Sequence, residues 1–477
     1  MLSFLMLVVA LPLVSCNGDN KVGNNDNNGE QPQGKVFNNA DYTILSRLTT
    51  AYEFDNSGEG TDDKVQRKIW ERNVFIKDTY DVNVNVITEP GDYDKRDSFI
   101  AKVRSSASSG EDEFSLISTH SSYLQSMAIE GLGIDLGNLP EINPTADWWS
   151  ESYYNTAKIN DSVYALIGDI SLTLYEYIEV VFFNVTLAEE YHVGDLYKTV
   201  TDGNWTLDKM MELTRVAAGF SNQAQEQYGL LSNSHATNSF AVSLGFKYTN
   251  KDGSTGQQKF RTTVPSKMDE AYKKILSFYS EDAVRYGMDG STDENVSNPL
   301  FSNGKALFYL QMLGQAEYFA AAMTDHKYSV LPFPKLEEGA NTGYKSTCRD
   351  SLSAQLIPIS VIDKEMVGTV TEAMCKFAHE QITPEYYEQR LKFRYFDDYQ
   401  VQTMLDYVRA GLAFDFAQIY GTAIAEWPYS SFSVVSDKNQ RAPGSETLAF
   451  HWKSNQQLWN ASLRELYATF DKLKKEN

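Results

Sequence analysis

Cysteine and histidine are scarce in this chain of 477 residues, which contains three cysteines and six histidines. No Cys-x-x-Cys pair and no histidine at ligand spacing accompanies Cys348 or Cys375, so the sequence predicts no metal site. Cys375 lies in an apolar helical pattern. We therefore predict two buried free thiols, although an exported protein could also join these cysteines in a disulfide.

Signatures of enzyme chemistry are also missing. His379-Glu380 is not followed by the second histidine of a zinc-protease motif, and no Gly-x-Ser-x-Gly, Walker or dinucleotide-binding glycine pattern occurs. The acidic loop at 55–63 is better interpreted as a solvated loop than as a calcium site. The sequence thus predicts a protein that is not an enzyme and needs no cofactor.

Positive charge is in deficit. The chain has 42 Lys and Arg against 64 Asp and Glu, which gives a formal net charge of −22 and a pI near 4.7. We find no compact basic cluster in the sequence. Lys472, Lys474 and Lys475 stand together, but at the end of a helix they are a favourable partner for its dipole. This balance argues against nucleic acid as a partner.

The N-terminus has the pattern of an export signal. No charged residue occurs from Met1 to Ser15, and the apolar run Phe4–Leu11 is too short to span a bilayer. The run ends in Leu13-Val14-Ser15-Cys16, which resembles the lipobox of bacterial lipoproteins. That resemblance implies a signal peptide over 1–16, lipidation of Cys16, and anchoring to the outer face of the cell membrane.

The segment 17–35 is built almost entirely from Asn, Gly, Asp, Gln, Glu and Pro. Such a composition cannot bury enough apolar area to offset the entropy of ordering it. We predict a flexible tether between the lipid anchor and the folded body.

The body opens with alternating strand and helix patterns. Tyr42–Leu48 is predicted as a strand and a helix follows the loop ending at Asp63. Val82, Val84 and Val86 alternate as in a second strand, and a helix at 98–107 precedes a third strand at Phe114–Ser118. This order predicts an α/β fold with a mostly parallel sheet, whose ligands bind at the carboxyl ends of the strands.

Further motifs follow in a fixed order along the body. They are Gly110–Phe114, Gly131–Leu136, Val163–Leu166, Val180–Asn184, Asp202–Asp208, Phe301–Phe308 and Val330–Pro334. Thr206 in the fifth motif is predicted to cap a helix. Their order and spacing resemble family 1 of the bacterial extracellular solute-binding proteins, the maltose-binding class.

That resemblance implies a two-lobed type II fold of the periplasmic-binding-protein kind, with discontinuous lobes joined by hinge strands. It places the chain crossings near Ile170–Val180, Lys345–Ser353 and Phe416–Ile424. Lobe one is then expected to comprise 36–170 with 352–418, and lobe two 171–351 with 419–477.

A polar ligand would need aromatic faces and hydrogen-bonding groups in a cleft between the lobes, and 13% of the residues are aromatic, including 29 tyrosines. Because aromatic residues mostly serve packing, position after strands and at crossings selects the candidates. The candidate ligand-binding residues are His120, Ser122, Tyr123, Tyr175, Glu176, Tyr177, His235, Asn238, Phe240, Arg349, Asp350, Trp427 and Tyr429.

Several of these candidates have an ordinary alternative. Tyr123 could be a packed residue beside a helix N-cap, 175–177 could belong to a paired strand, and Arg349 with Asp350 could form a hinge ion pair.

The expected function is capture of a polar solute, an oligosaccharide in the first instance, for import by an ABC transporter. The expected partners are a small solute, the transporter permease subunits and the membrane, with the protein as a monomer. A lipid-anchored glycan hydrolase with a carboxylate pair, and a binding or sensor module without transport, remain as alternatives.

Overall fold

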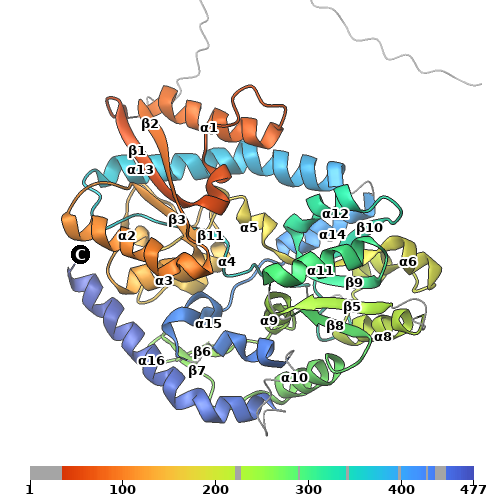
Figure 1. Ribbon diagram of the computed structural model, residues 1–477. Helices are drawn as coiled ribbons and strands as arrows, with labels where there is room; N and C mark the ends of the chain where they lie inside the picture. The colour runs from red at the N-terminus through yellow and green to blue at the C-terminus, as the bar shows by residue number, and fades with distance from the viewer. Residues whose placement is uncertain are drawn as a thin grey trace, which may run out of the picture. The chain divides into compact units, whose positions relative to one another are not determined.

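Two β-sheets and one separate two-stranded hairpin organise the residues that the computed structural model describes (Figure 1). These residues are 35–220, 227–287, 290–339, 343–395, 399–425, 428–435 and 447–476. The predicted signal peptide with Cys16, nearly all of the predicted tether, and Trp427 lie outside them.

Lobe one is the part of the chain built around the sheet β11-β3-β1-β2. Its strands are β1 (Ala40–Arg47), β2 (Val82–Glu89), β3 (Leu116–His120) and β11 (Ser353–Leu356). Strand β1 pairs in parallel with both β2 and β3, whereas β11 runs antiparallel to β3. The helices α1 (Lys64–Tyr80) and α2 (Arg96–Ser109) make the crossovers. The predicted strand and helix order of this part is confirmed.

Lobe two is the part built around the sheet β10-β4-β9-β5-β8. Its strands are β4 (Glu179–Asn184), β5 (Tyr228–Asn233), β8 (Val284–Gly287), β9 (Ala306–Met312) and β10 (Tyr328–Leu331). Strand β5 is parallel to β8 and β9, and β4 is antiparallel to β9 and β10. The sheet is therefore mixed rather than mostly parallel, because β4 enters this lobe directly from a crossing segment without a helical crossover.

Side-chain caps fix several helix starts. Thr206 accepts a hydrogen bond from the backbone N–H of Lys209 (3.2 Å) at the start of α8 (Leu207–Ala218), as predicted. Asp63 likewise caps α1 through the N–H groups of Val65 and Gln66. The remaining longer helices are α3 (Ser121–Ile129), α9 (Ser234–Ser243), α10 (Ser266–Phe278), α11 (Gly290–Ser302), α13 (Lys364–Phe377), α14 (Tyr399–Ala410) and α16 (Leu448–Glu476).

Shorter helices complete the chain. They are α4 (Glu151–Ala157), α5 (Thr173–Glu176), α6 (Val185–Glu190), α7 (Leu196–Thr201), α12 (Ala316–Ala322) and α15 (Phe416–Ile419). The helix α5 replaces the strand pairing considered for 175–177. It lies between the two sheets in Figure 1.

Three segments that connect the lobes lie side by side. The backbone N–H of Arg349 donates to the carbonyl of Tyr177 (3.0 Å), and that of Glu179 donates to Thr347 (2.9 Å). The backbone N–H of Ser346 donates to Gly411 (2.9 Å). These contacts lie at 177–179, 346–349 and 411–413, and the crossings near 170–180, 345–353 and 416–424 stay a prediction.

Two long helices contact both lobes. Helix α13 packs Phe377 on Phe75 of α1 (5.4 Å between ring centroids), and its π-helical continuation η6 (Pro384–Tyr395) packs Tyr387 on Tyr175 (5.4 Å). Helix α16 contacts α10 near its start and packs Phe470 on Tyr164 of lobe one near its end (5.2 Å).

The packing differs from the predicted lobe boundaries at two helices. Helix α14 contacts β10 and α7 of lobe two, although 399–410 were assigned to lobe one. Helix α16 was assigned to lobe two and reaches both lobes. The cause is that each helix presents apolar side chains to whichever lobe its connecting segment reaches, which local sequence does not encode.

Two further features concern membranes and thiols. Within the described ranges, no helix has the length and apolar character needed to cross a bilayer. Cys348 and Cys375 are both buried and free, so the prediction of two free thiols is confirmed.

Candidate functional site

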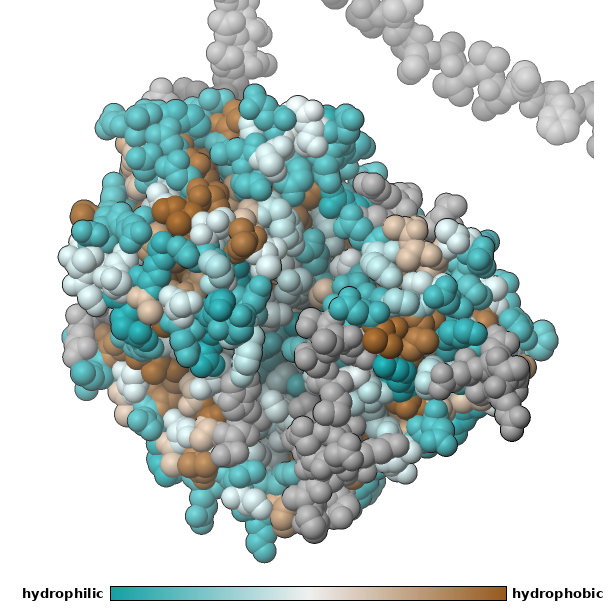
Figure 2. All heavy atoms as spheres, in the orientation of Figure 1, coloured by the Kyte–Doolittle hydropathy of each residue, from teal (hydrophilic) through white to brown (hydrophobic). Residues whose placement is uncertain are grey.

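Strand ends bring the first candidate residues to the space between the lobes. Strand β3 ends at His120 and α3 starts at once with Ser121 and Ser122, while β5 ends at Asn233 and α9 starts with Ser234. Both are carboxyl ends of strands that pair in parallel, where α/β sheets bind ligands. Figure 2 shows the face in view hollowed near its middle, with hydrophilic side chains in the visible part of the hollow.

A cavity of about 220 Å³ lies where these strand ends meet the crossing segments. Its lining comes from α3, α9, the second crossing, and the chain from α15 to the 3-10 helix η8 (Pro428–Val435). The lining residues are Ser122, Ser234, His235, Asn238, Cys348, Arg349, Asp350, Gln418, Gly421, Thr422, Tyr429 and Ser430.

Six of the predicted residues line this cavity. They are Ser122, His235, Asn238, Arg349, Asp350 and Tyr429. His120 and Tyr123 are not part of this lining and stack on each other, with ring centroids 4.2 Å apart and ring planes 15° from parallel.

The charge of Arg349 is neutralised within the protein. Its Nε lies 2.6 Å from Glu179 Oε1, its Nη1 lies 3.4 Å from Glu294 Oε1, and its Nη2 donates to Gln311 Oε1. The Glu179 side chain is 1% exposed. Burial raises the pKa of Glu179, and Arg349 opposes that shift. The alternative of an ion pair between Arg349 and Asp350 is therefore wrong, because the guanidinium pairs with Glu179 and Glu294 instead.

Asp350 supplies the carboxylate that faces the cavity. Burial raises its pKa, while a hydrogen bond from Ser122 and the charges of Arg349 and Arg47 favour the ionised form. Its backbone carbonyl accepts a hydrogen bond from Ser121 Oγ (2.9 Å), which fixes the start of α3 against the second crossing. The cavity thus holds a carboxylate that no lining cation pairs with directly.

Both histidines at the site are neutral. Burial, followed by the charge of Arg349, lowers the pKa of His235 to about 3. Burial and then Arg47 hold the pKa of His120 well below its usual value. The Nε2 atom of His120 lies 2.7 Å from Arg47 Nη1, and because the guanidinium can only donate, Nε2 is the acceptor.

Two buried polar atoms at this site lack a hydrogen-bond partner among the described residues. They are the side-chain oxygen of Asn238 and the hydroxyl of Tyr123. Because an unsatisfied buried polar group costs roughly 1–3 kcal/mol, a guest that hydrogen-bonds to the Asn238 oxygen, which belongs to a lining residue, would gain free energy. The site therefore offers a carboxylate, an amide oxygen, hydroxyls and neutral imidazole to a polar guest.

Four predicted residues lie away from the cavity lining. The Tyr175 hydroxyl donates to Asp169, and its ring is covered by Arg409 at 5.4 Å. Glu176 accepts a hydrogen bond from Tyr52, and Tyr177 holds Arg349 through its backbone carbonyl. Phe240 is 0% exposed and packs edge-on against Phe333 in the core of lobe two.

Tyr175 and Glu176 are absent from the cavity lining because they lie on the short helix α5. It turns the side chains of 175 and 176 toward other partners, whereas an extended strand would have left alternate side chains open to the cleft.

Sequence reasoning did not single out Gln418 and Thr422. Gln418 Nε2 donates to the carbonyl of Cys348 (2.7 Å), and Thr422 Oγ1 donates to the carbonyl of Ser122 (3.1 Å). The signal that could have found them is the range 416–424 predicted for the third crossing, which contains both residues.

Comparisons with known proteins give similarity of structure alone. No protein-family model and no curated protein matches the sequence. Among solved structures, the sugar-binding protein MalE from Xanthomonas citri has a TM-score of 0.58 and 11% identity, covering 92% of this chain and 100% of its own.

Two other solved structures give the same result. The galacto-N-biose-/lacto-N-biose I-binding protein from Bifidobacterium longum has a TM-score of 0.57 and 14% identity, covering 91% of this chain and 98% of its own. A substrate-binding protein from Listeria monocytogenes in complex with cycloalternan has a TM-score of 0.52 and 13% identity, covering 91% and 99%. The chain therefore has the two-lobed type II fold of these solved binding proteins, and the predicted fold class is confirmed.

Proposed function

We propose that this chain is an extracellular solute-binding protein that captures an uncharged saccharide between its lobes and delivers it to an ABC importer. The fold supports a binding role, and three similar structures are sugar-binding or substrate-binding proteins by name. Lipidation of Cys16 and attachment to the outer face of the membrane belong to the same proposal.

The observation that carries the proposal is the charge arrangement around Asp350. Its carboxylate faces the cavity, while the cation in the lining, Arg349, is neutralised by Glu179. A neutral polyol can donate hydroxyl groups to the carboxylate and to the Asn238 oxygen. An anion would meet the carboxylate without a compensating cation, so the cavity selects against acidic solutes.

The size of the cavity favours a small saccharide. Its volume of about 220 Å³ lies below the roughly 300–1,000 Å³ of most ligand pockets. One or two sugar rings would suit the space between Asp350 and Asn238, with the Tyr429 side chain in the same lining.

Closure of the lobes is the proposed mechanism. A guest that touches α3 on lobe one and α9 on lobe two stabilises the closed arrangement, and the importer then recognises it. The bonds of the solute stay intact. The crossing segments, which are paired through backbone hydrogen bonds, are the places where the rotation would occur.

Titration calorimetry against neutral sugars, amino sugars and uronic acids tests the ligand class. We expect a neutral sugar to bind and the corresponding uronic acid to bind far more weakly. Asp350→Asn should weaken the neutral sugar by about 10–100-fold, because it removes a hydrogen bond to a charged group. The matched control Asp202→Asn, on an exposed residue of lobe two, should change nothing.

Small-angle scattering with and without the bound sugar tests the closure. Equal binding of the uronic acid and the neutral sugar would contradict the proposed selection. An unchanged radius of gyration on binding would contradict the mechanism. Loss of membrane attachment in Cys16→Ser is the expected result for the anchor.

A further inference from the structure

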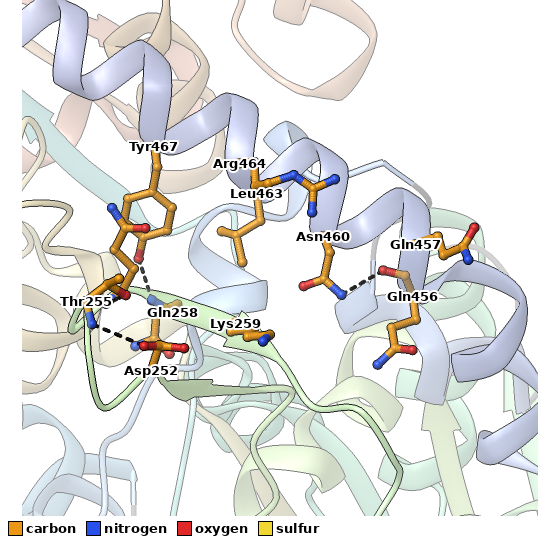
Figure 3. Close-up of a pocket in the computed structure, with 11 residues that line it drawn as sticks. Asp252, Thr255, Gln258, Lys259, Gln456, Gln457, Asn460, Leu463, Arg464 and Tyr467 are labelled. Atoms are coloured by element: carbon orange, nitrogen blue, oxygen red, sulfur yellow. Dashed lines mark hydrogen bonds between the residues drawn. The ribbon is translucent and has the colours of Figure 1, made fainter.

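A second hollow, larger than the cavity between the lobes, lies under α16. Its volume is about 710 Å³, within the usual range for ligand pockets of roughly 300–1,000 Å³. One wall is α16, and the other is the hairpin of β6 (Thr249–Lys251) and β7 (Gln258–Phe260). In Figure 3, side chains from the helix and from the hairpin border the same open space.

The side chains of α16 that border this hollow are mostly polar, and Arg464 among them is exposed to solvent. Gln456, Asn460, Arg464 and Tyr467 follow one another at helical spacing and lie on one face. The buried face of α16 is apolar, as is usual for a helix that packs on the body of a protein, and the hollow lies beside it. Here the space stays open and is bordered by carboxamides instead of being filled by packing.

The carboxamides keep hydrogen-bonding capacity for a guest. Gln456 Nε2 donates to the carbonyl of Arg261 (2.6 Å), and Asn460 Nδ2 donates to the carbonyl of Gln456 (2.9 Å). Their side-chain oxygens have no protein partner among the described residues. Gln258 uses its oxygen to accept from Thr249 (2.8 Å), which leaves its NH₂ group as a donor. Free acceptors and donors on neighbouring amides suit the hydroxyl groups of a sugar.

Positive charge gathers here in a strongly acidic protein. The stretch 247–261 contains Lys247, Lys251, Lys259 and Arg261 against a single acid, Asp252. None of these four cations, nor Arg464 on α16, takes part in an ion pair with any described residue, and Lys259 and Arg464 are exposed and border the hollow. Four of these five cations lie within 247–261 and could have been recognised in the sequence, whereas Arg464 joins the lining of the hollow only through the fold.

Two acids lie near these cations without forming an ion pair with them: Asp252, which also lines the hollow and whose pKa is lowered mainly by hydrogen bonds and in small part by Lys259, and Asp415. Asp252 accepts hydrogen bonds from the backbone N–H groups of Ser254 (2.9 Å) and Thr255 (3.1 Å) in the hairpin turn. Asp415 is buried and caps α15 through the N–H of Ala417 (2.8 Å). Unpaired cations on a chain with a net charge of −22 point to an anionic partner.

We propose that this hollow is a second ligand site, and that it binds an acidic saccharide. A uronate carboxylate would pair with Lys259 and Arg464, and the sugar hydroxyls would hydrogen-bond to Gln258, Gln456 and Asn460. The side chains of Leu463 and Tyr467 supply apolar surface for the C–H face of the ring. The two sites then differ in charge preference, and this inference does not rest on the function proposed for the cavity between the lobes.

Calorimetry on the full chain with trigalacturonate tests the inference, with its fully methyl-esterified form as the uncharged counterpart. We expect the acid to bind and the ester to bind at least about tenfold more weakly. The double variant Lys259→Gln/Arg464→Gln should reduce acid binding by about tenfold or more. Both side chains are exposed, so the fold should be unaffected.

The matched control is Lys198→Gln/Lys274→Gln, which makes the same change in net charge at two exposed cations elsewhere on lobe two. It should leave acid binding unchanged, as should Asp350→Asn in the cavity between the lobes. Failure of trigalacturonate to bind, equal binding of acid and ester, or equal loss in both double variants would overturn the inference.

Inorganic phosphate and phosphatidylglycerol vesicles form the last arm of the test. If either binds through Lys259 and Arg464 and displaces trigalacturonate, the site is one for phosphate or lipid headgroups and the saccharide assignment is overturned. Neither should compete if the carboxamides select sugar hydroxyls.

Discussion

Removal of the charge of Glu179 should destabilise the protein far more than removal of an exposed ion pair. In Glu179→Gln, Arg349 keeps its position but loses the anion 2.6 Å from its Nε. Both side chains are almost completely buried, at 8% and 1% exposure. Breaking one member of such a pair costs roughly 3–5 kcal/mol, because a buried charge is left uncompensated.

The structure favours the lower end of that range. Glu294 Oε1 remains 3.4 Å from Arg349 Nη1, and its side chain is 24% exposed, so part of the compensation survives. We expect a loss of about 3 kcal/mol in the free energy of unfolding. For lobes of this size, a shift of roughly 2–4 °C per kcal/mol predicts a melting temperature about 6–12 °C lower.

Scanning calorimetry or urea unfolding measures this difference, with Asp202→Asn as the control. Lys198 and Asp202 also lie 2.6 Å apart, but their side chains are 67% and 45% exposed. Such a pair contributes about 0–1 kcal/mol. The reasoning is refuted if Glu179→Gln lowers the melting temperature no more than Asp202→Asn does.

A double variant sharpens the test. Glu179→Gln/Arg349→Gln removes both charges, so it should lose clearly less stability than the sum of the two single variants. The single variant Glu179→Gln should also improve binding of uronic acids in the cavity between the lobes, since the charge of Arg349 is then no longer neutralised there. Additive losses in the double variant would show that the two charges act independently.

Three smaller effects should also be measurable. Burial raises the pKa of Glu176 from 4.5 to about 7, so the stability from its protonation is complete below the unfolded pKa and is lost as pH rises through 7. Relative to Glu176→Gln, the protein should lose up to about 3 kcal/mol between pH 5 and 8, visible in melting temperatures across that range. Parallel profiles would contradict this. Thr206→Ala should cost about 1 kcal/mol in urea unfolding because α8 loses its cap, whereas Thr206→Ser should cost less. Cys348 and Cys375 should resist a thiol reagent at neutral pH in the native state and react in urea, because burial raises both thiol pKa values. Rapid native labelling of either would refute that.

Local sequence was sufficient for the elements that depend on neighbouring residues. Apolar alternation at Val82 and Val84 marked β2, and Thr206 marked the start of α8. The carboxyl ends of β3 and β5 could be recognised because a parallel sheet always presents them at one edge. For this reason Ser122, His235 and Asn238 could be chosen from their positions in the sequence.

Only the tertiary structure could decide which side chains meet across long sequence separations. Tyr175, Glu176 and Phe240 looked equivalent to Tyr429 as candidates, but packing gives the first three other partners. Gln418 reaches the cavity because the third crossing lies beside the second.

The neutralisation of Arg349 by Glu179, and the presence of Lys259 and Arg464 around one hollow, have the same origin. Charges far apart along the chain are brought together by the packing of whole helices and strands, which depends on long-range contacts. Periodicity and capping, in contrast, act over a few residues and can be read locally. The sequence alone therefore determined the elements and the strand ends at which the candidate residues lie, and the tertiary structure decided the charge that each of the two hollows presents.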